Sequence, residues 1–325
     1  MILGERIFLT AALEAGARRV LQVLDRRTGA TLWTHETKDA DPERTSALAG
    51  HAASTAAVDA SRVVAFFGNA GVVCCDLEGR LLWRRSLGEF KSELGIASSP
   101  ILHQDLVVIV GDHDGASFIV ALDAKTGEER WRTSRPGLER SWSTPVVVDD
   151  RLIVNAQDEL RAYDPLDGRL LWRVEGMSGW VTPSPVVGKG LIYATSGKDG
   201  PTVAVKPDGT LVWREERGGH YVCSPLYLDG LLYVPDEQGR LSCRDAATGA
   251  LVYRERLKGK FTASPVAGDG KIYLANEEGT VFVVKGGRRY ELLAENVLGE
   301  EILASPAIAR RELFIRTRTR LYCVR

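Results

Sequence analysis

The sequence predicts an all-β fold built from eight copies of a small four-stranded antiparallel sheet. Three observations predict it: a pattern recurs about every 40 residues, short apolar runs alternate with turn residues inside each copy, and helical periodicity is missing over any useful length. Meanders of ~40 residues repeated along a chain indicate a β-propeller, in which each sheet is one radial blade. We therefore predict a single propeller domain over residues 1–325.

Each copy opens on a Ser-Pro or Thr-Pro dipeptide that leads into an apolar strand. The prolines are 45, 40, 40, 40 and 41 residues apart. The pairs are Ser99-Pro100, Thr144-Pro145, Ser184-Pro185, Ser224-Pro225, Ser264-Pro265 and Ser305-Pro306, with Thr55-Ala56 as a degenerate earlier copy.

Each copy closes on a turn, usually begun by Asp, with a glycine and then an aromatic residue four positions later. The glycine can take the positive φ that the turn needs. The fixed spacing then places the large ring on one face of the outer strand, where it can bury against the neighbouring blade. The pairs are Gly29/Trp33, Gly79/Trp83, Gly127/Trp131, Gly168/Trp172, Gly209/Trp213 and Gly249/Tyr253.

One copy shows how the four strands follow one another. Residues 144–148 and 151–155 are apolar runs separated by an Asp-Asp turn, and residues 160–164 alternate like a half-buried strand. A turn with Pro, Asp and Gly then leads into the fourth strand, residues 169–175.

Counting strands predicts that the first and last blades are incomplete in this chain. Second and third strands occur eight times, the last pair being residues 313–315 and 321–324. Fourth strands occur seven times, and the seventh, near Tyr290–Leu293, has lost the Trp pattern. Alignment of the copies places Met1 inside the first strand of blade 1. We hypothesise that the chain is an N-terminally clipped form of an eight-bladed ring.

Composition narrows the classes of partner. Lys and Arg number 42 against 43 Asp and Glu, so no overall basic field favours nucleic acid. No stretch approaches the ~20 apolar residues of a membrane helix, and the residues after Met1 do not resemble an export signal. We expect a monomer that does not insert into a membrane.

The residues with catalytic or metal-binding potential are scattered. Standard hydrolase, metalloprotease and nucleotide-binding motifs are missing from the sequence, and the five histidines form no metal-binding pair. The five cysteines are odd in number and lack zinc spacing, so we interpret them as buried hydrophobes. The adjacent Cys74 and Cys75 lie mid-strand, where successive side chains point to opposite faces.

The best candidate site lies at the positions five residues before each blade's proline position. They are mostly polar or aromatic and differ between copies, and the first strand of a propeller blade lines the axis. We expect them to ring one mouth of the central channel as a ligand- or partner-binding site. The alternative is a mouth that is polar because water fills it. The seven positions are His51, Gly95, Arg140, Trp180, His220, Lys260 and Glu301, and Trp142 lies close to them.

The repeat resembles a known family. Residues 120–131, Val-Ala-Leu-Asp-Ala-Lys-Thr-Gly-Glu-Glu-Arg-Trp, are a near-consensus copy of the pyrroloquinoline-quinone (PQQ)-type propeller repeat. Quinoprotein alcohol dehydrogenases and BamB-like outer-membrane assembly lipoproteins share that repeat. The segments 66–71 and 142–145 and the chain length look most like the stand-alone BamB-like proteins.

That resemblance implies a non-catalytic scaffold that binds protein or peptide partners, with no cofactor and a periplasmic or otherwise extracytoplasmic location. Two alternatives stay open. One is a dehydrogenase that depends on PQQ and calcium and places an adjacent-cysteine disulfide against the quinone. The other is a propeller that binds a small molecule or glycan at the channel mouth. Fold alone does not choose between them.

Overall fold

The computed structural model describes residues 1–39, 41–46, 48–139 and 141–325. These residues form eight antiparallel sheets and two short 3-10 helices, η1 (Glu14–Gly16) and η2 (Gly68–Ala70). Seven sheets have four strands, and the last has three. The predicted class, an all-β eight-bladed propeller of antiparallel blades with an incomplete last blade, is confirmed. The first blade was also predicted to be incomplete, but it has four strands, the first of which is the short segment Ile2–Leu3. Prolonged helical structure is missing from the described residues, as the periodicity predicted.

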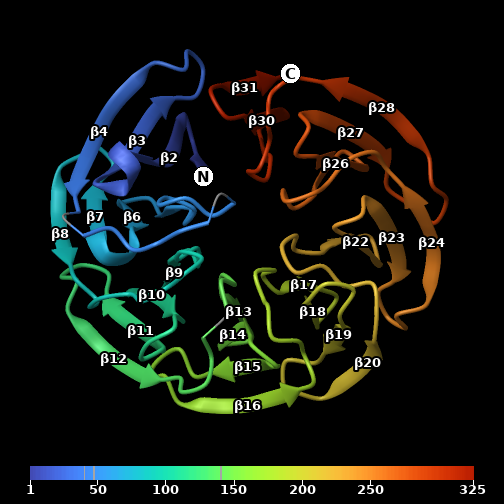
Figure 1. Ribbon diagram of the computed structural model, residues 1–325, viewed down its shortest axis with the longest axis horizontal. Helices are drawn as coiled ribbons and strands as arrows, with labels where there is room; N and C mark the ends of the chain where they lie inside the picture. Colours follow the sequence, from blue (N-terminus) through green and yellow to red (C-terminus); the bar gives the residue numbers. More distant parts are fainter. Residues whose placement is uncertain (40, 47, 140) are drawn as a thin grey trace. The chain divides into compact units, whose positions relative to one another are not determined.

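The chain divides into two compact units, and the first comprises Met1–Leu152 and Tyr163–Leu170. In each of its three complete sheets the strands are hydrogen-bonded in chain order, and the fourth strand forms the outer edge (Figure 1). The strands are β1 (Ile2–Leu3), β2 (Arg6–Leu13), β3 (Arg18–Asp25) and β4 (Thr31–Lys38); β5 (Ala57–Val58), β6 (Arg62–Phe66), β7 (Val72–Asp76) and β8 (Leu81–Arg85); and β9 (Ile101–His103), β10 (Leu106–Gly111), β11 (Phe118–Asp123) and β12 (Glu129–Ser134).

The boundary between the units falls within the fourth sheet. Its strands, again in chain order, are β13 (Val146–Val148), β14 (Arg151–Ala156), β15 (Glu159–Tyr163) and β16 (Leu170–Glu175). These bounds agree with the strands predicted from the sequence to within two residues at each end.

The second unit comprises Ile153–Ala162 and Leu171–Arg325. It contains the remaining four sheets, whose strands also follow chain order. They are β17 (Val186–Gly188), β18 (Leu191–Thr195), β19 (Thr202–Val205) and β20 (Leu211–Glu215); β21 (Leu226–Leu228), β22 (Leu231–Pro235), β23 (Arg240–Asp245) and β24 (Leu251–Arg256); β25 (Val266–Gly268), β26 (Lys271–Ala275), β27 (Thr280–Lys285) and β28 (Leu292–Val297); and β29 (Ala307–Ala309), β30 (Glu312–Arg316) and β31 (Leu321–Val324).

The fourth strand of the seventh sheet begins slightly later than predicted. β28 starts at Leu292, and Tyr290 lies in the turn before it. There the Tyr290 ring packs edge-to-face against Tyr253 of the preceding sheet, with 5.8 Å between ring centroids. Tyr290 is therefore used for packing between two sheets and does not take part in the strand.

The repeated tryptophan joins each sheet to the next. In five cases its indole Nε1 donates a hydrogen bond to a backbone carbonyl in the following sheet's third-to-fourth strand turn, at 2.9–3.0 Å. The ring also covers the glycine of that turn: a methyl group on Gly127, whose φ is +73°, would lie 2.6 Å from the Trp83 ring. A β-bulge directly before the aromatic position recurs in six sheets and sets the direction of this residue. The scaffold role predicted for the Gly and Trp positions is confirmed.

The repeated Ser or Thr before proline makes a second link between neighbouring first strands. Its hydroxyl oxygen accepts a hydrogen bond from the backbone N–H of the equivalent residue one sheet earlier. The pairs at 2.9–3.1 Å are Thr55 to Ser99 and Ser99 to Thr144 in the first unit, and Ser184 to Ser224, Ser224 to Ser264 and Ser264 to Ser305 in the second. A short hydroxyl side chain at this position therefore satisfies a backbone donor that the strands themselves leave unpaired.

Candidate binding site

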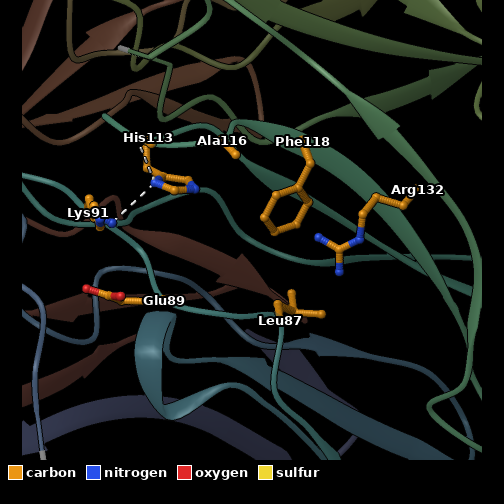
Figure 2. A pocket seen from close by; sticks show the side chains of 8 residues that line it. Leu87, Glu89, Lys91, His113, Ala116, Phe118 and Arg132 are labelled. Atoms are coloured by element: carbon orange, nitrogen blue, oxygen red, sulfur yellow. Dashed lines mark hydrogen bonds between the residues drawn. The ribbon is translucent and has the colours of Figure 1, made fainter.

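The first unit contains a pocket of about 340 Å³ between its second and third sheets. Three segments contribute to it: the connection after β8, the turn between β10 and β11 with the start of β11, and β12. Figure 2 shows the Phe118 ring and the Leu87 side chain pointing toward one another from opposite sides. The lining residues are Leu87, Glu89, Lys91, His113, Gly115, Ala116, Phe118 and Arg132.

A buried ion pair holds the long turn that forms one wall of this pocket. The turn runs from Asp112 to Ser117, and Asp112 accepts two hydrogen bonds from Arg135, at 2.7 and 2.8 Å. Both side chains are completely buried. Arg135 also donates to the Tyr163 hydroxyl, and its backbone N–H donates to the Ser117 carbonyl. The turn is thus fixed at both ends, although it lacks strand hydrogen bonds along its length.

His113 presents a fixed hydrogen-bond donor to the pocket. Its Nδ1 accepts hydrogen bonds from the backbone N–H groups of Lys91 and Gly115, at 3.2 and 3.1 Å. An imidazole nitrogen that accepts carries no proton, so the proton of the neutral ring is on Nε2. Burial lowers the pKa of His113, which keeps the ring neutral at pH 7. Figure 2 shows the Nε2 edge turned into the pocket.

The opposite end of the pocket combines an apolar wall with a positioned cation. Leu87 and Phe118 are both buried and belong to the same hydrophobic core. The Arg132 guanidinium lies over the Phe118 ring, 4.1 Å from its centroid. Its Nε and Nη2 donate to the Glu129 carboxylate at 3.0 and 2.9 Å, which leaves Nη1 outside that pair. Two neighbours therefore fix the guanidinium in one orientation.

The remaining charged groups of the pocket are Lys91 and Glu89, both exposed at its rim. Within the part of the chain that the structure describes, neither side chain forms an ion pair. The pocket thus offers N–H donors from Lys91, His113 and Arg132 against one carboxylate, beside an apolar surface.

The predicted channel-mouth residues of the first unit lie in the connections between sheets. The Trp142 indole Nε1 donates to the Gly95 carbonyl at 2.7 Å, so these two positions are joined by a direct contact. The His51 ring lies against Gly16 of η1, and its backbone carbonyl accepts a hydrogen bond from the buried Arg19 at 2.7 Å. Arg140 lies outside the described residues.

The predicted residues of the second unit differ in exposure. Trp180 has 42% of its surface exposed. Lys260 is exposed, with its backbone N–H donating to Glu278, and Glu301 is paired with Arg318 at 3.2 Å. His220 is completely buried. That these residues together form one ligand-binding site stays a prediction.

His220 has a structural role that the sequence pattern did not indicate. Its Nδ1 accepts hydrogen bonds from the backbone N–H groups of Val222 and Cys223, at 2.8 and 3.1 Å. Burial lowers the pKa of His220 to about 4, and the Asp236 carboxylate only partly opposes this. The imidazole therefore organises the turn before β21 in its neutral form.

We predict that His220 makes the folded state sensitive to mild acid. The unfolded chain binds a proton at this residue near pH 6.5, whereas the folded chain does so only near pH 4. Stability is therefore complete above pH 6.5 and falls by about 3 kcal/mol as the pH drops to 4. His220→Asn keeps an acceptor for the two backbone N–H groups but cannot titrate. Urea unfolding from pH 7 to 4 should show a shallower loss in this variant, and an unchanged slope would contradict the prediction.

The cysteine pair does not fit the quinone contact that the dehydrogenase alternative requires. Cys74 and Cys75 are free, completely buried thiols on β7. Cys74 belongs to the core shared with β10 and β11, whereas Cys75 belongs to the core shared with β2 and β3. The two side chains thus point to opposite faces, as predicted. Burial raises the pKa of Cys74 to about 12 and that of Cys75 to about 11, so both stay protonated.

No group of three or more metal-ligating side chains occurs among the described residues, and none of their helices is long and apolar enough to cross a membrane.

The pocket between the second and third sheets was not predicted from the sequence. One signal was present: the prolines on either side of the third sheet are 45 residues apart instead of 40. The turn between β10 and β11 has six residues, whereas the turn between β14 and β15 has two.

Comparisons with known proteins agree with the fold. The structure is similar to that of BamB from Moraxella catarrhalis, with a TM-score of 0.73, 14% identity, and coverage of 98% of this chain and 95% of that one. It is also similar to the quinohemoprotein alcohol dehydrogenase from Comamonas testosteroni, with a TM-score of 0.74, 12% identity, and coverage of 95% and 68%. At these identities the similarities establish the fold alone.

Sequence comparison identifies the family as well as the fold. The chain is 29% identical over 180 residues to the outer membrane protein assembly factor BamB of Alkalilimnicola ehrlichii. The match covers 53% of this chain and 45% of that protein's length. The family described as “Outer membrane protein assembly factor BamB” matches residues 16–206 and 198–292. Because the family pattern extends over most of the repeats, the chain belongs to the BamB family of PQQ-like propellers.

Proposed function

We propose that this protein is a non-catalytic scaffold that assists outer-membrane protein assembly by binding an extended protein segment along β28. The family supports the general role, since the relatives are named as outer membrane protein assembly factors. The proposal places the protein outside the cytoplasm and includes no cofactor. The observation that carries it is the composition of the β28 edge.

β28 is the least protected outer strand of the complete sheets. Edge strands normally carry charged residues, which discourage pairing with another chain. The other outer strands each contain at least two charged residues, whereas β28 contains one, Glu295. Val297 is 73% exposed and Leu293 is 43% exposed. Residues Ala294–Val297 pair with β27 in continuous register, so the outer edge is regular (Figure 1).

This edge suits the addition of a strand from a partner. Main-chain groups on the open side of a regular strand can pair with an extended segment, while exposed apolar side chains supply contact area. The aromatic residue of the repeat is replaced by Ala294, which also leaves less side-chain bulk on this strand. By contrast β24 continues with Arg254, Glu255 and Arg256 after its aromatic residue.

We expect a charge on the β28 edge to abolish function in cells. In the native host, loss of the gene should lower the amount of assembled outer-membrane protein, and the wild-type chain should restore it. Leu293→Lys/Val297→Lys should fail to restore it, because the two charges oppose pairing at the edge. The matched control is Leu251→Lys on β24, because Leu251 is 49% exposed, close to the 43% of Leu293. Full restoration by the β28 variant, at equal protein level, would contradict the proposal.

We also expect no quinone chemistry. Purified protein incubated with PQQ and Ca²⁺ should retain no quinone absorbance after gel filtration and should not oxidise alcohols with a redox dye. The physical reason is that the buried Cys74 and Cys75 point to opposite faces and cannot form a surface for the quinone. Dye-linked alcohol oxidation that depends on PQQ would overturn the non-catalytic assignment.

A further inference from the structure

We propose that the pocket of the first unit binds a peptide segment in which one acidic residue lies next to an aromatic residue. The inference rests on the proposed function in taking a peptide as its ligand, but it concerns a different surface. The pocket lies between the second and third sheets, whereas β28 is in the seventh.

The donors of the pocket select a carboxylate. Lys91, the Nε2–H of His113 and the Nη1 of Arg132 all provide N–H groups, so the ligand must supply acceptor oxygens. An anionic acceptor is favoured over a neutral one because hydrogen bonds between charged groups are stronger. Arg132 is already oriented by Phe118 and Glu129, so little side-chain freedom is lost on binding.

The apolar wall selects an aromatic side chain next to that carboxylate. Leu87 and Phe118 face one another across the pocket, and the Phe118 ring has one face under the guanidinium (Figure 2). An aromatic ring entering between them would contact Leu87 and the edge of Phe118. A volume of about 340 Å³ is at the small end of ligand sites, and it suits one large side chain with a neighbouring carboxylate.

Glu89 limits the number of acidic groups. It is the one carboxylate of the lining and lies near Lys91 at the rim (Figure 2). A second negative charge on the ligand would be repelled there, so the pocket prefers a segment with a single acid. Removing the Glu89 charge should therefore strengthen binding, an effect that damage to the fold cannot produce.

The test uses acetyl-Phe-Glu-amide with the full chain and follows the backbone amide signals of Lys91 and Gly115 by NMR. Both N–H groups bond to His113 Nδ1 and so report on the pocket. We expect saturable shifts at millimolar peptide. Acetyl-Phe-Gln-amide and acetyl-Ala-Glu-amide should each bind at least about tenfold more weakly, since each lacks one of the two recognised groups.

Variants of Arg132 and Glu89 test whether the peptide binds in this pocket. Arg132→Gln should weaken binding about tenfold, and Glu89→Gln should strengthen it about two- to threefold. Arg130→Gln is the matched control, because Arg130 is on the same strand and is also ion-paired but does not line the pocket. Equal binding of the neutral peptide, or no effect of Arg132→Gln, would overturn the inference.

The source of the carboxylate is tested in the same titration. If 3-phenylpropionate binds as tightly as the peptide, the ligand is a free aromatic acid and the assignment to a peptide is wrong. Failure here while the β28 variants still lose function would leave the proposed scaffold role standing. If the β28 variants keep full function while the peptide still binds, the proposed scaffold role along β28 is wrong and the peptide pocket stands.

Discussion

Asp112→Asn is expected to lower the free energy of unfolding by about 3–5 kcal/mol, because it leaves the Arg135 charge buried without its counter-ion. Both side chains are completely buried and joined by two hydrogen bonds. Burial disfavours the charged guanidinium, and Asp112 more than offsets this, so the pKa of Arg135 is raised. The Tyr163 hydroxyl cannot replace the carboxylate, since it is uncharged. Urea unfolding at pH 7 measures the change.

Two variants separate the buried charge from simple loss of contacts. The double variant Asp112→Asn/Arg135→Met removes the charge together with its partner, so it should be less destabilised than Asp112→Asn alone. Asp105→Asn breaks an exposed ion pair with Arg130 and should change stability by no more than about 1 kcal/mol. If Asp112→Asn behaved like Asp105→Asn, the charge would not be buried as the structure shows.

The fold was predictable because its determinants repeat. The Ser or Thr before proline, the turn glycine and the tryptophan each contact the neighbouring sheet, so each recurs at the same place in most copies. Gly127 and Trp83 show this directly: the Trp83 ring occupies the space that a side chain at position 127 would need. A contact between successive copies imposes a fixed period on the sequence, and a period is visible without a structure.

The pocket was not predictable because its residues occur at unlike positions of unlike copies. Leu87 and Lys91 follow one fourth strand, His113 lies in an enlarged turn, and Arg132 is in an outer strand. Nothing in the repeat aligns them, and only the turn's extra length marks the region. The channel-mouth prediction relied on equivalence between copies, and that equivalence does not extend to burial: His220 is enclosed whereas Trp180 is exposed.

Trp83→Ala is expected to destabilise the protein by about 3–5 kcal/mol, because it removes a large buried ring from the contact between two sheets. The ring belongs to the core of the second and third sheets, and its Nε1 donates to the Ala124 carbonyl at 3.0 Å. Gly127→Ala should also be destabilising, for two separate reasons. Its φ of +73° disfavours any side chain, at roughly 1 kcal/mol, and the new methyl group would overlap the ring.

A double-mutant cycle distinguishes these two costs. In the Trp83→Ala background the overlap disappears, so Gly127→Ala should then cost only the backbone part, roughly 1 kcal/mol. The two substitutions are therefore less than additive, and urea unfolding of the four proteins gives the coupling. Gly29→Ala is the control, because its φ is +72° but nothing lies within 4 Å of the added methyl group. Strict additivity would mean that the glycine is required by the turn alone, and that the ring does not determine its place in the repeat.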